Sequence, residues 1–231
     1  MNYAILLSGG TGTRTGSEIP KQYVRRNGHM MITEALGILL KSPCIDRVVI
    51  TADEAWQDEI LKDAQAAGLP ADRMMGFARP GDTRQLSIYN AIEYILEKAG
   101  NKSEDDTVLV HDAARPYITQ ELIIACYDAL PGYDGVMPVL PMKDTVYLSE
   151  DGKGITGLLD RSKVYAGQAP ELFRLQPYYI ANQRLMPSDI YKINGASEPA
   201  VLAGMKIAMI PGDEKNTKVT SAGDLEKFVN R

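Results

Sequence analysis

The stretch YAILLSGGTGTR, residues 3–14, decides the fold of this chain. Its first part, Tyr3–Leu7, is a short continuous apolar run, which predicts a strand buried on both faces. Gly9 and Gly10 follow almost at once, and glycines directly after a strand let backbone N–H groups approach phosphate oxygens closely. The spacing matches neither GxGxxG nor GxxxxGK[ST]. The stretch therefore indicates either a phosphate-binding turn or an ordinary tight turn of an α/β protein.

The alternation of short apolar runs with amphipathic stretches continues downstream. Further strands are expected at Arg47–Thr51, Met74–Phe77, Thr107–Val110, Gly135–Leu140 and Lys206–Ile210. Helical spacing of apolar residues predicts helices over Met31–Leu40, Glu54–Ala67, Thr83–Ala99, Glu121–Leu130, Tyr178–Leu185 and Ser221–Phe228, with Asp53 as a helix cap. This order predicts an α/β fold with a mostly parallel twisted sheet and helices on both faces.

The pattern changes after Leu140. Two strand-like runs, Lys143–Leu148 and Ile155–Leu159, flank the turn-rich residues 150–154. These runs predict a protruding β-hairpin arm at residues 142–169 rather than another strand–helix unit. Residues 1–231 are then expected to form a single domain that carries this arm.

Composition and charge narrow the function classes. The formal net charge of −5 disfavours a nucleic-acid-binding surface. The sequence has no apolar run of the ~20 residues needed to cross a bilayer, so we expect neither a nucleic acid nor a membrane as partner. Its two cysteines, Cys44 and Cys126, lack metal-type spacing and are expected in the core. The N-terminus has no basic segment before its apolar run, so a cytoplasmic location is expected.

Basic residues accompany two of the strand ends. Arg14 and Lys21 follow the glycine turn, where they either bind phosphate or are simply solvated. Asp112 and Arg115 lie in the run HDAARP after the strand at 107–110, and ligands of open α/β sheets bind at such strand ends. Arg115 suits bidentate phosphate binding, and Asp112 suits a magnesium-bound triphosphate or a hydroxyl. Alternatively, Asp112 pairs with Arg115 and caps the next helix. His111 is expected to be structural.

Two further motifs have a functional and a plain interpretation. The run Gly81-Asp82-Thr83-Arg84, with Ser87, stands at a predicted helix start. It either hydrogen-bonds a base or ribose, or it is a helix cap beside a surface arginine. Lys218, in residues 213–220, is either part of a site or a solvated lysine.

Taken together, these motifs resemble one family. The ordered runs LSGGTGTR with PKQY, GDTRQLS, VLVHDAARP, MKDTVY, DRSKVYAGQAPELF and NTKVT are similar to those of the 2-C-methyl-D-erythritol 4-phosphate cytidylyltransferases and the related ribitol-5-phosphate cytidylyltransferases. The resemblance runs from Tyr3 to Phe228. It implies a Rossmann-like nucleotidyltransferase fold and transfer of CMP from CTP to a polyol phosphate, with release of pyrophosphate. Methylerythritol phosphate is expected ahead of ribitol phosphate.

The resemblance also implies a role for each matching residue. The catalytic residues would be Arg14, Lys21 and Lys218. The CTP-binding residues would be Ser8, Gly9, Gly10, Thr11, Gly12, Gly81, Asp82, Ser87 and Ala113. The acceptor-binding residues would be Asp112, Arg115, Thr145 and Arg161, the last on an arm that reaches a neighbouring subunit of a homodimer. Mg²⁺ would be bound mainly through the CTP phosphates, and no metal ligands are assigned.

Two positions depart from the family pattern. Ala169 stands where the family commonly has threonine, and Asn194-Gly195 stands where it commonly has Thr-Asp. Both positions belong to the polyol-phosphate pocket in the family, so the identity of the acceptor stays open. The residues that match the family's CTP-binding motifs are all retained. A uridylyl- or thymidylyltransferase and a non-catalytic nucleotide sensor remain as alternative functions.

Overall fold

The computed structural model describes residues 1–10, 19–100 and 103–231. Its main sheet contains β1 (Asn2–Leu7), β4 (Arg47–Thr51), β5 (Met74–Ala78), β6 (Thr107–Asp112), β7 (Gly135–Pro141), β10 (Tyr165–Gly167), β11 (Glu171–Arg174) and β12 (Ile207–Pro211). The helices are α1 (Met31–Lys41), α2 (Glu54–Ala66), α3 (Arg84–Lys98), α4 (Gln120–Asp128), α5 (Leu175–Gln183), α6 (Glu198–Leu202) and α7 (Ala222–Val229). Two small antiparallel pairs stand outside this sheet: β2 (Arg25–Arg26) with β3 (His29–Met30), and β8 (Val146–Leu148) with β9 (Gly157–Leu159).

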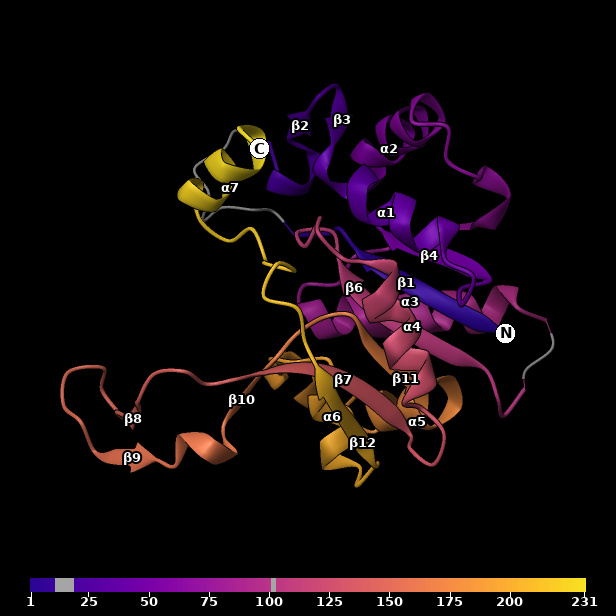
Figure 1. The fold of residues 1–231 in the computed structure, drawn as a ribbon. Helices are drawn as coiled ribbons and strands as arrows, with labels where there is room; N and C mark the ends of the chain where they lie inside the picture. Colours follow the sequence, from indigo (N-terminus) through magenta and orange to yellow (C-terminus); the bar gives the residue numbers. More distant parts are fainter. Residues whose placement is uncertain (11–18, 101–102) are drawn as a thin grey trace.

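The centre of the sheet is parallel. β6, β1, β4 and β5 pair side by side in that order. Figure 1 shows β6, β1 and β4 next to one another. Leu7, the last residue of β1, is in register with Thr51 on one side and with Asp112 on the other. The residues that follow these strands therefore meet at one edge of the sheet, as expected for the carboxyl ends of parallel strands.

Helices cover both faces because the central strands are apolar on both sides. Ala4 and Leu6 of β1 pack in a core with residues of α1, α2 and α4. Tyr3 and Ile5, which point the other way, pack in a second core with residues of α3, α5 and α6. The predicted α/β class, with a mostly parallel sheet and helices on both faces, is confirmed.

Two strands of the main sheet, and the two-residue strands β2 and β3 outside it, were not predicted from the sequence. In the main sheet, β10 and β11 run antiparallel to β7, and β11 also runs antiparallel to β6. They are three and four residues long, too short for a periodic pattern to stand out. The predicted strand 107–110 extends to Asp112, so His111 and Asp112 belong to β6 itself. Asp53 caps α2 as expected, because its carboxylate accepts the Ala55 N–H at 3.0 Å.

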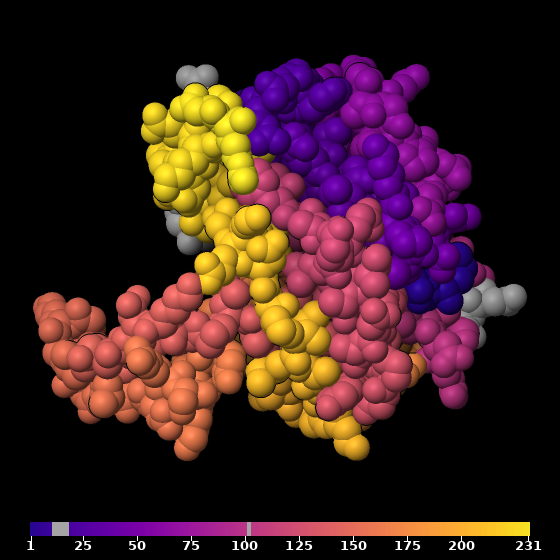
Figure 2. Space-filling model, viewed as in Figure 1, coloured from indigo at the N-terminus to yellow at the C-terminus, as the bar shows by residue number. Residues whose placement is uncertain are grey.

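The predicted arm is present. β8 and β9 form a hairpin that stands away from the body of the molecule, to the left in Figures 1 and 2. Its strands are shorter than expected, three residues each. Large apolar side chains are exposed on it, including Ile155 at 70% and Leu158 at 65%. Within the described parts of the chain, we find no helix whose length and apolar character would suffice to cross a bilayer.

Candidate active site

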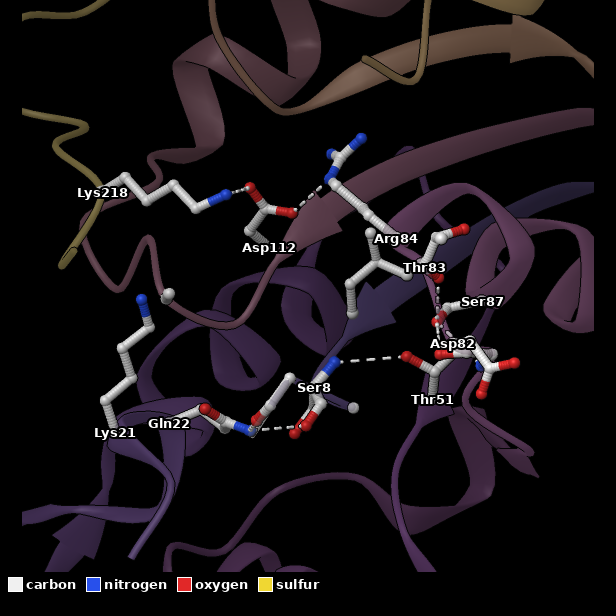
Figure 3. Close-up of a pocket in the computed structure, with 15 residues that line it drawn as sticks. Ser8, Lys21, Gln22, Thr51, Asp82, Thr83, Arg84, Ser87, Asp112 and Lys218 are labelled. Atoms are coloured by element: carbon white, nitrogen blue, oxygen red, sulfur yellow. Dashed lines mark hydrogen bonds and ion pairs between the residues drawn. The ribbon is translucent and has the colours of Figure 1, made fainter. Parts of the chain in front are cut away.

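A cavity of about 620 Å³ opens at the carboxyl ends of the parallel strands. Figure 3 shows its lining, to which β1, β4, β6 and the start of α3 all contribute. The lining residues are Leu7, Ser8, Gly9, Gly10, Lys21, Gln22, Thr51, Gly81, Asp82, Thr83, Arg84, Ser87, Asp112, Ala114 and Lys218. Lys21 and Lys218 thus line one cavity beside the glycine turn, although they are 197 positions apart in the chain.

The residues next to Lys21 hold the glycine turn in place. The Gln22 side-chain amide donates to the carbonyl oxygens of Ser8 at 2.7 Å and of Gly10 at 2.6 Å. The Tyr23 hydroxyl lies 2.9 Å from the Ser8 carbonyl oxygen, and its ring stacks on Trp56 with centroids 4.2 Å apart. These contacts fix the turn and place Lys21 at the mouth of the cavity.

Two glycines let the backbone pass close to neighbouring groups. A Cβ atom on Gly9 would lie 2.5 Å from the Cβ of Pro80, far inside contact distance. A Cβ on Gly81 would lie 2.5 Å from Leu86 and 2.8 Å from its backbone carbon. Because neither position has room for a side chain, the turn after β1 and the loop before α3 form adjoining backbone walls of the cavity.

Lys218 is positioned by a loop that is tied to the end of β6. The Val219 N–H donates to the Ala114 carbonyl at 2.8 Å, and the Arg115 guanidinium donates to the Asn216 carbonyl at 2.7 Å. The Asn216 side chain in turn donates to the Ala169 carbonyl at 2.7 Å. Arg115 therefore serves as a brace for the Lys218 loop.

Asp112 is the centre of charge in the cavity. Its Oδ1 accepts from Arg84 Nε at 3.0 Å and its Oδ2 from Lys218 Nζ at 2.8 Å, as Figure 3 shows. Arg115 Nε is farther away, at 4.0 Å from Oδ2. Burial by itself would raise the pKa of Asp112, but the charges of Arg84 and Lys218 outweigh it and hold the pKa far below its usual range. Asp112 is thus an ionised acceptor held from two sides.

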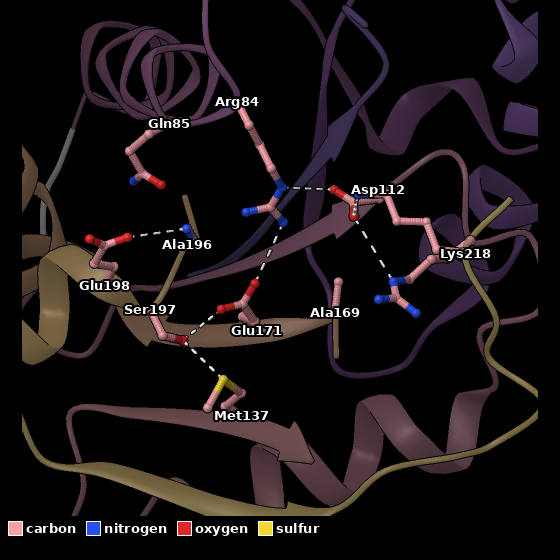
Figure 4. Close-up of polar contacts among 12 residues, drawn as sticks. Arg84, Gln85, Asp112, Met137, Ala169, Glu171, Ala196, Ser197, Glu198 and Lys218 are labelled. Atoms are coloured by element: carbon pink, nitrogen blue, oxygen red, sulfur yellow. Dashed lines mark hydrogen bonds and ion pairs between the residues drawn. The ribbon is translucent and has the colours of Figure 1, made fainter. Parts of the chain in front are cut away.

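Arg84 is not the surface arginine that its position at a helix start suggested. Its guanidinium lies between two buried carboxylates, with Nη2 3.5 Å from Glu171 Oε1 as well as Nε on Asp112 (Figure 4). Burial lowers the pKa of Arg84, but the two carboxylates more than offset this effect and raise it. Thr83, its neighbour, is the helix cap, because its hydroxyl oxygen accepts the Leu86 N–H at 3.2 Å.

The geometry is that of an anion site, because a glycine turn, two lysines and the half-buried Arg84 converge beside the Asp112 carboxylate. The family model for 2-C-methyl-D-erythritol 4-phosphate cytidylyltransferase, IspD, matches residues 3–228. The chain belongs to the IspD family. It is a cytidylyltransferase, and therefore a nucleotidyltransferase, as the sequence analysis predicted.

Individual IspD relatives agree with the family assignment. The chain is 32% identical to the 2-C-methyl-D-erythritol 4-phosphate cytidylyltransferase of Rubrobacter xylanophilus, over 96% of this chain and 90% of that protein. It is 27% identical to the ribitol-5-phosphate cytidylyltransferase of Lacticaseibacillus paracasei, over 97% and 95%. The crystal structure of the Francisella tularensis IspD shares its fold, with a TM-score of 0.80, 24% identity and coverage of 98% and 97%.

Most residues to which the IspD resemblance gave a role lie together. Ser8, Gly9, Gly10, Lys21, Gly81, Asp82, Ser87, Asp112 and Lys218 line the cavity. Thr11, Gly12 and Arg14 lie outside the described residues. Ala113 is fully buried and does not line the cavity, whereas Ala114 does.

The remaining predicted residues lie elsewhere. Arg115 braces the Lys218 loop, and Thr145 and Arg161 stand on the exposed arm, where Arg161 donates to the Lys143 carbonyl at 2.6 Å. His111 is structural as predicted: it is fully buried, with Nε2 3.0 Å from the Arg115 carbonyl oxygen. Gln22 and Thr51 also line the cavity and were given no role from the sequence, although Gln22 lies in the PKQY run. Arg84 was named within the motif at residues 81–84, but its two carboxylate partners were not foreseen.

Proposed function

We propose that this IspD family member transfers CMP from CTP to a polyol phosphate, with 2-C-methyl-D-erythritol 4-phosphate as the leading acceptor. The observation that carries the proposal is the convergence of Lys21 and Lys218 on one cavity beside the glycine turn. A triphosphate needs such a set of cations, which come here from distant parts of the chain.

In the proposed reaction, an oxygen of the acceptor phosphate attacks the α-phosphorus of CTP. The new P–O bond forms as the bond between the α-phosphorus and the bridging oxygen to the β-phosphate breaks, and pyrophosphate leaves. Because the attacking phosphate is already ionised near neutral pH, no strong general base is needed. Lys21, Lys218 and Arg14 are proposed to stabilise the negative charge that develops on phosphate oxygens.

Lys218 changes partner in this proposal. In the cavity it donates to Asp112, and a bound triphosphate would compete for the same ammonium group. Arg84 keeps Asp112 paired in either case, since it binds the other carboxylate oxygen. Ser8, Gly9 and Gly10 are proposed to lie against the phosphates, and Gly81, Asp82 and Ser87 against cytosine and ribose.

We propose Mg²⁺ as the divalent cation of the reaction. The described residues contain no group of three or more His, Cys, Asp or Glu side chains that could hold a metal ion. Asp112 and Asp82 are the acidic side chains of the described cavity lining. The donor set fits a cation that is held mainly by CTP phosphate oxygens, because two carboxylates with other proposed partners do not make a protein metal site. Bound there, Mg²⁺ supplies further neutralisation of phosphate charge.

We further propose a homodimer in which the arm of one subunit reaches the site of the other. Tyr147, Ile155 and Leu158 expose large apolar areas on the arm, which in a monomer would remain in water. Thr145 and Arg161 stand on the same arm and are proposed to contact the acceptor in the partner subunit.

Ribitol 5-phosphate is the second candidate acceptor. Ala169 lacks a hydroxyl at a position of the proposed acceptor pocket, and a ribitol-5-phosphate cytidylyltransferase is among the relatives.

We also propose that residues 1–231 act as one domain with residues 142–169 as its arm. The cytoplasm is the proposed compartment, in line with the free thiols of Cys44 and Cys126.

The test is an acceptor panel. The purified chain is incubated with CTP and Mg²⁺ plus methylerythritol 4-phosphate, ribitol 5-phosphate or another alditol phosphate, and pyrophosphate release is measured. UTP and dTTP replace CTP in parallel reactions. We expect release with CTP and one preferred acceptor. CTP binding without release with any acceptor would instead support a nucleotide sensor.

A further inference from the structure

Behind Asp112 lies a buried chain of polar contacts that the reaction described above does not use. Arg84 bridges Asp112 and Glu171, and Glu171 Oε2 accepts the Ser197 hydroxyl at 2.6 Å (Figure 4). The chain therefore runs from the end of β6, through α3 and β11, to the residue that precedes α6. Glu171 and Ser197 are both only 7% exposed, and neither lines the cavity.

We propose that Arg84 and Glu171 are positioning residues, which orient the Asp112 carboxylate so that it binds the hydroxyl groups of the acceptor. This inference rests on the proposed function, because it presumes a polyol phosphate in the cavity.

The contacts of Asp112 indicate which part of the acceptor it binds. An ionised carboxylate has about four acceptor positions and no proton to donate. Within the part of the chain that the structure describes, Arg84 and Lys218 donate to one oxygen each, which leaves acceptor positions that a hydroxyl group in the cavity can use. A phosphate would be repelled by the carboxylate, whereas a hydroxyl can donate to it. Asp112 therefore suits the carbinol part of the acceptor, and the lysines suit its phosphate.

Glu171 matters because it fixes the far side of Arg84. A guanidinium with one carboxylate partner can pivot about that contact, whereas two partners on different strands define its plane. Asp112 belongs to β6. Glu171 belongs to the adjacent strand β11, where it is in register with Val110 of β6. Ser197 fixes Glu171 in turn. Loss of the Glu171 charge would let Arg84 turn, and the Asp112 carboxylate would turn with it.

The same series of polar contacts links the proposed acceptor site to the turn before α6. The Glu198 carboxylate accepts the N–H groups of Asn194 at 2.8 Å and Gly195 at 3.4 Å, which holds the turn that presents Ser197. Changes in this turn can therefore reach Asp112 through Ser197, Glu171 and Arg84, without any contact between the turn and the acceptor.

The test is the variant Glu171→Gln, which keeps the side-chain shape and a hydrogen bond to Ser197 but removes the charge. We expect KM for the preferred acceptor to rise about tenfold while KM for CTP changes less than twofold. Arg84→Lys should give a larger acceptor effect, because an ammonium group cannot bridge both carboxylates in one plane. In an Asp112→Asn background, Glu171→Gln should add little, since it acts through Asp112.

Asp63→Asn is the matched control. Asp63 is also a buried carboxylate paired with an arginine, Arg25 at 2.6 Å, but it lies outside the cavity lining. This variant should lower Tm and leave both KM values unchanged. If Glu171→Gln behaves like Asp63→Asn, or raises both KM values equally, the positioning role is wrong.

Calorimetric titration separates this inference from the proposed function. If the wild type binds an acceptor phosphate without turning it over, the proposed reaction fails, and weaker acceptor binding by Glu171→Gln still supports the positioning role. Equal binding by both proteins overturns that role. If the wild type binds none of the panel acceptors, with or without CTP, both proposals fall.

Discussion

Lys218 Nζ lies 2.8 Å from Asp112 Oδ2, although the two residues are 106 positions apart in the chain. The contact joins the loop after β12 to the end of β6. Lys218, which is proposed to act on the nucleotide, is therefore also the partner of Asp112, which is proposed to bind the acceptor. In the proposed reaction this ion pair couples the nucleotide to the acceptor, because a bound triphosphate would compete with Asp112 for Lys218.

Lys21→Ala and Lys218→Ala are expected to lower turnover by roughly 10²- to 10³-fold each, the size of effect seen when one charge-stabilising donor is removed. Both lysines lie at the cavity mouth and not in a core, so Tm should fall by only a few degrees. Steady-state kinetics and thermal melts of both variants measure this. Lys62→Ala, at an exposed lysine paired with Glu59, should match the wild type in both assays. Near-normal turnover in either cavity variant would remove the assigned role.

His111 is expected to make the chain less stable as the pH falls from about 7 toward 5. Burial lowers its pKa from 6.5 to about 4, so the unfolded chain takes up a proton in this range and the native protein does not. The free energy of unfolding should drop by about 2 kcal/mol between pH 7 and pH 5 on this account. Urea denaturation at several pH values measures the drop.

The matched variant for this titration is His111→Gln, which cannot take up the proton. It is expected to be less stable at pH 7, because it loses the fit around the buried ring, but to show a flatter pH dependence between pH 7 and pH 5. Parallel curves for the two proteins would mean that other groups cause the acid sensitivity.

Gly9→Ala should destabilise the chain and weaken CTP binding, whereas Gly10→Ala should not destabilise it. A Cβ on Gly9 meets the rigid ring of Pro80 at 2.5 Å, while a Cβ on Gly10 meets no atom of the described residues within 4 Å. Overpacking of this kind typically costs about 1–3 kcal/mol. Chemical denaturation and CTP titration of the pair measure the difference. Equal stability of the two variants would show that the turn after β1 can move away from Pro80.

Leu158→Asp is expected to shift the chain toward a monomer, because it places a charge on the exposed apolar surface of the arm. Sedimentation velocity at several concentrations measures the change. The control is Leu202→Asp, at an apolar residue of α6 that is 66% exposed, against 65% for Leu158. If the wild type is a monomer at micromolar concentration, the dimer proposal is wrong. If turnover falls together with dimer content, the arm is supported as part of the neighbouring site.

The sequence by itself determined the layered architecture and the place of the glycine turn that lines the cavity. Short uninterrupted apolar runs such as Tyr3–Leu7, alternating with amphipathic segments, are typical of buried strands whose sheet is covered by helices. The glycine turn then follows from its place after the first strand. These features depend on neighbouring residues, so they are visible in the order of residue types. The short strands β10 and β11 escaped, because three or four residues carry no periodic signal.

The tertiary structure alone decided the partners of the charged residues. The sequence placed Asp112 near Arg115, and the nearest contacts are instead Arg84 and Lys218, which are 28 and 106 positions away. It also gave no sign that Glu171 shares Arg84 with Asp112. Ion pairs depend on which strand ends and loops lie close together in space. The pairing of β11 with β6 and β7 determines which of them do so here. Such long-range neighbours leave no local pattern, so only the folded chain reveals them.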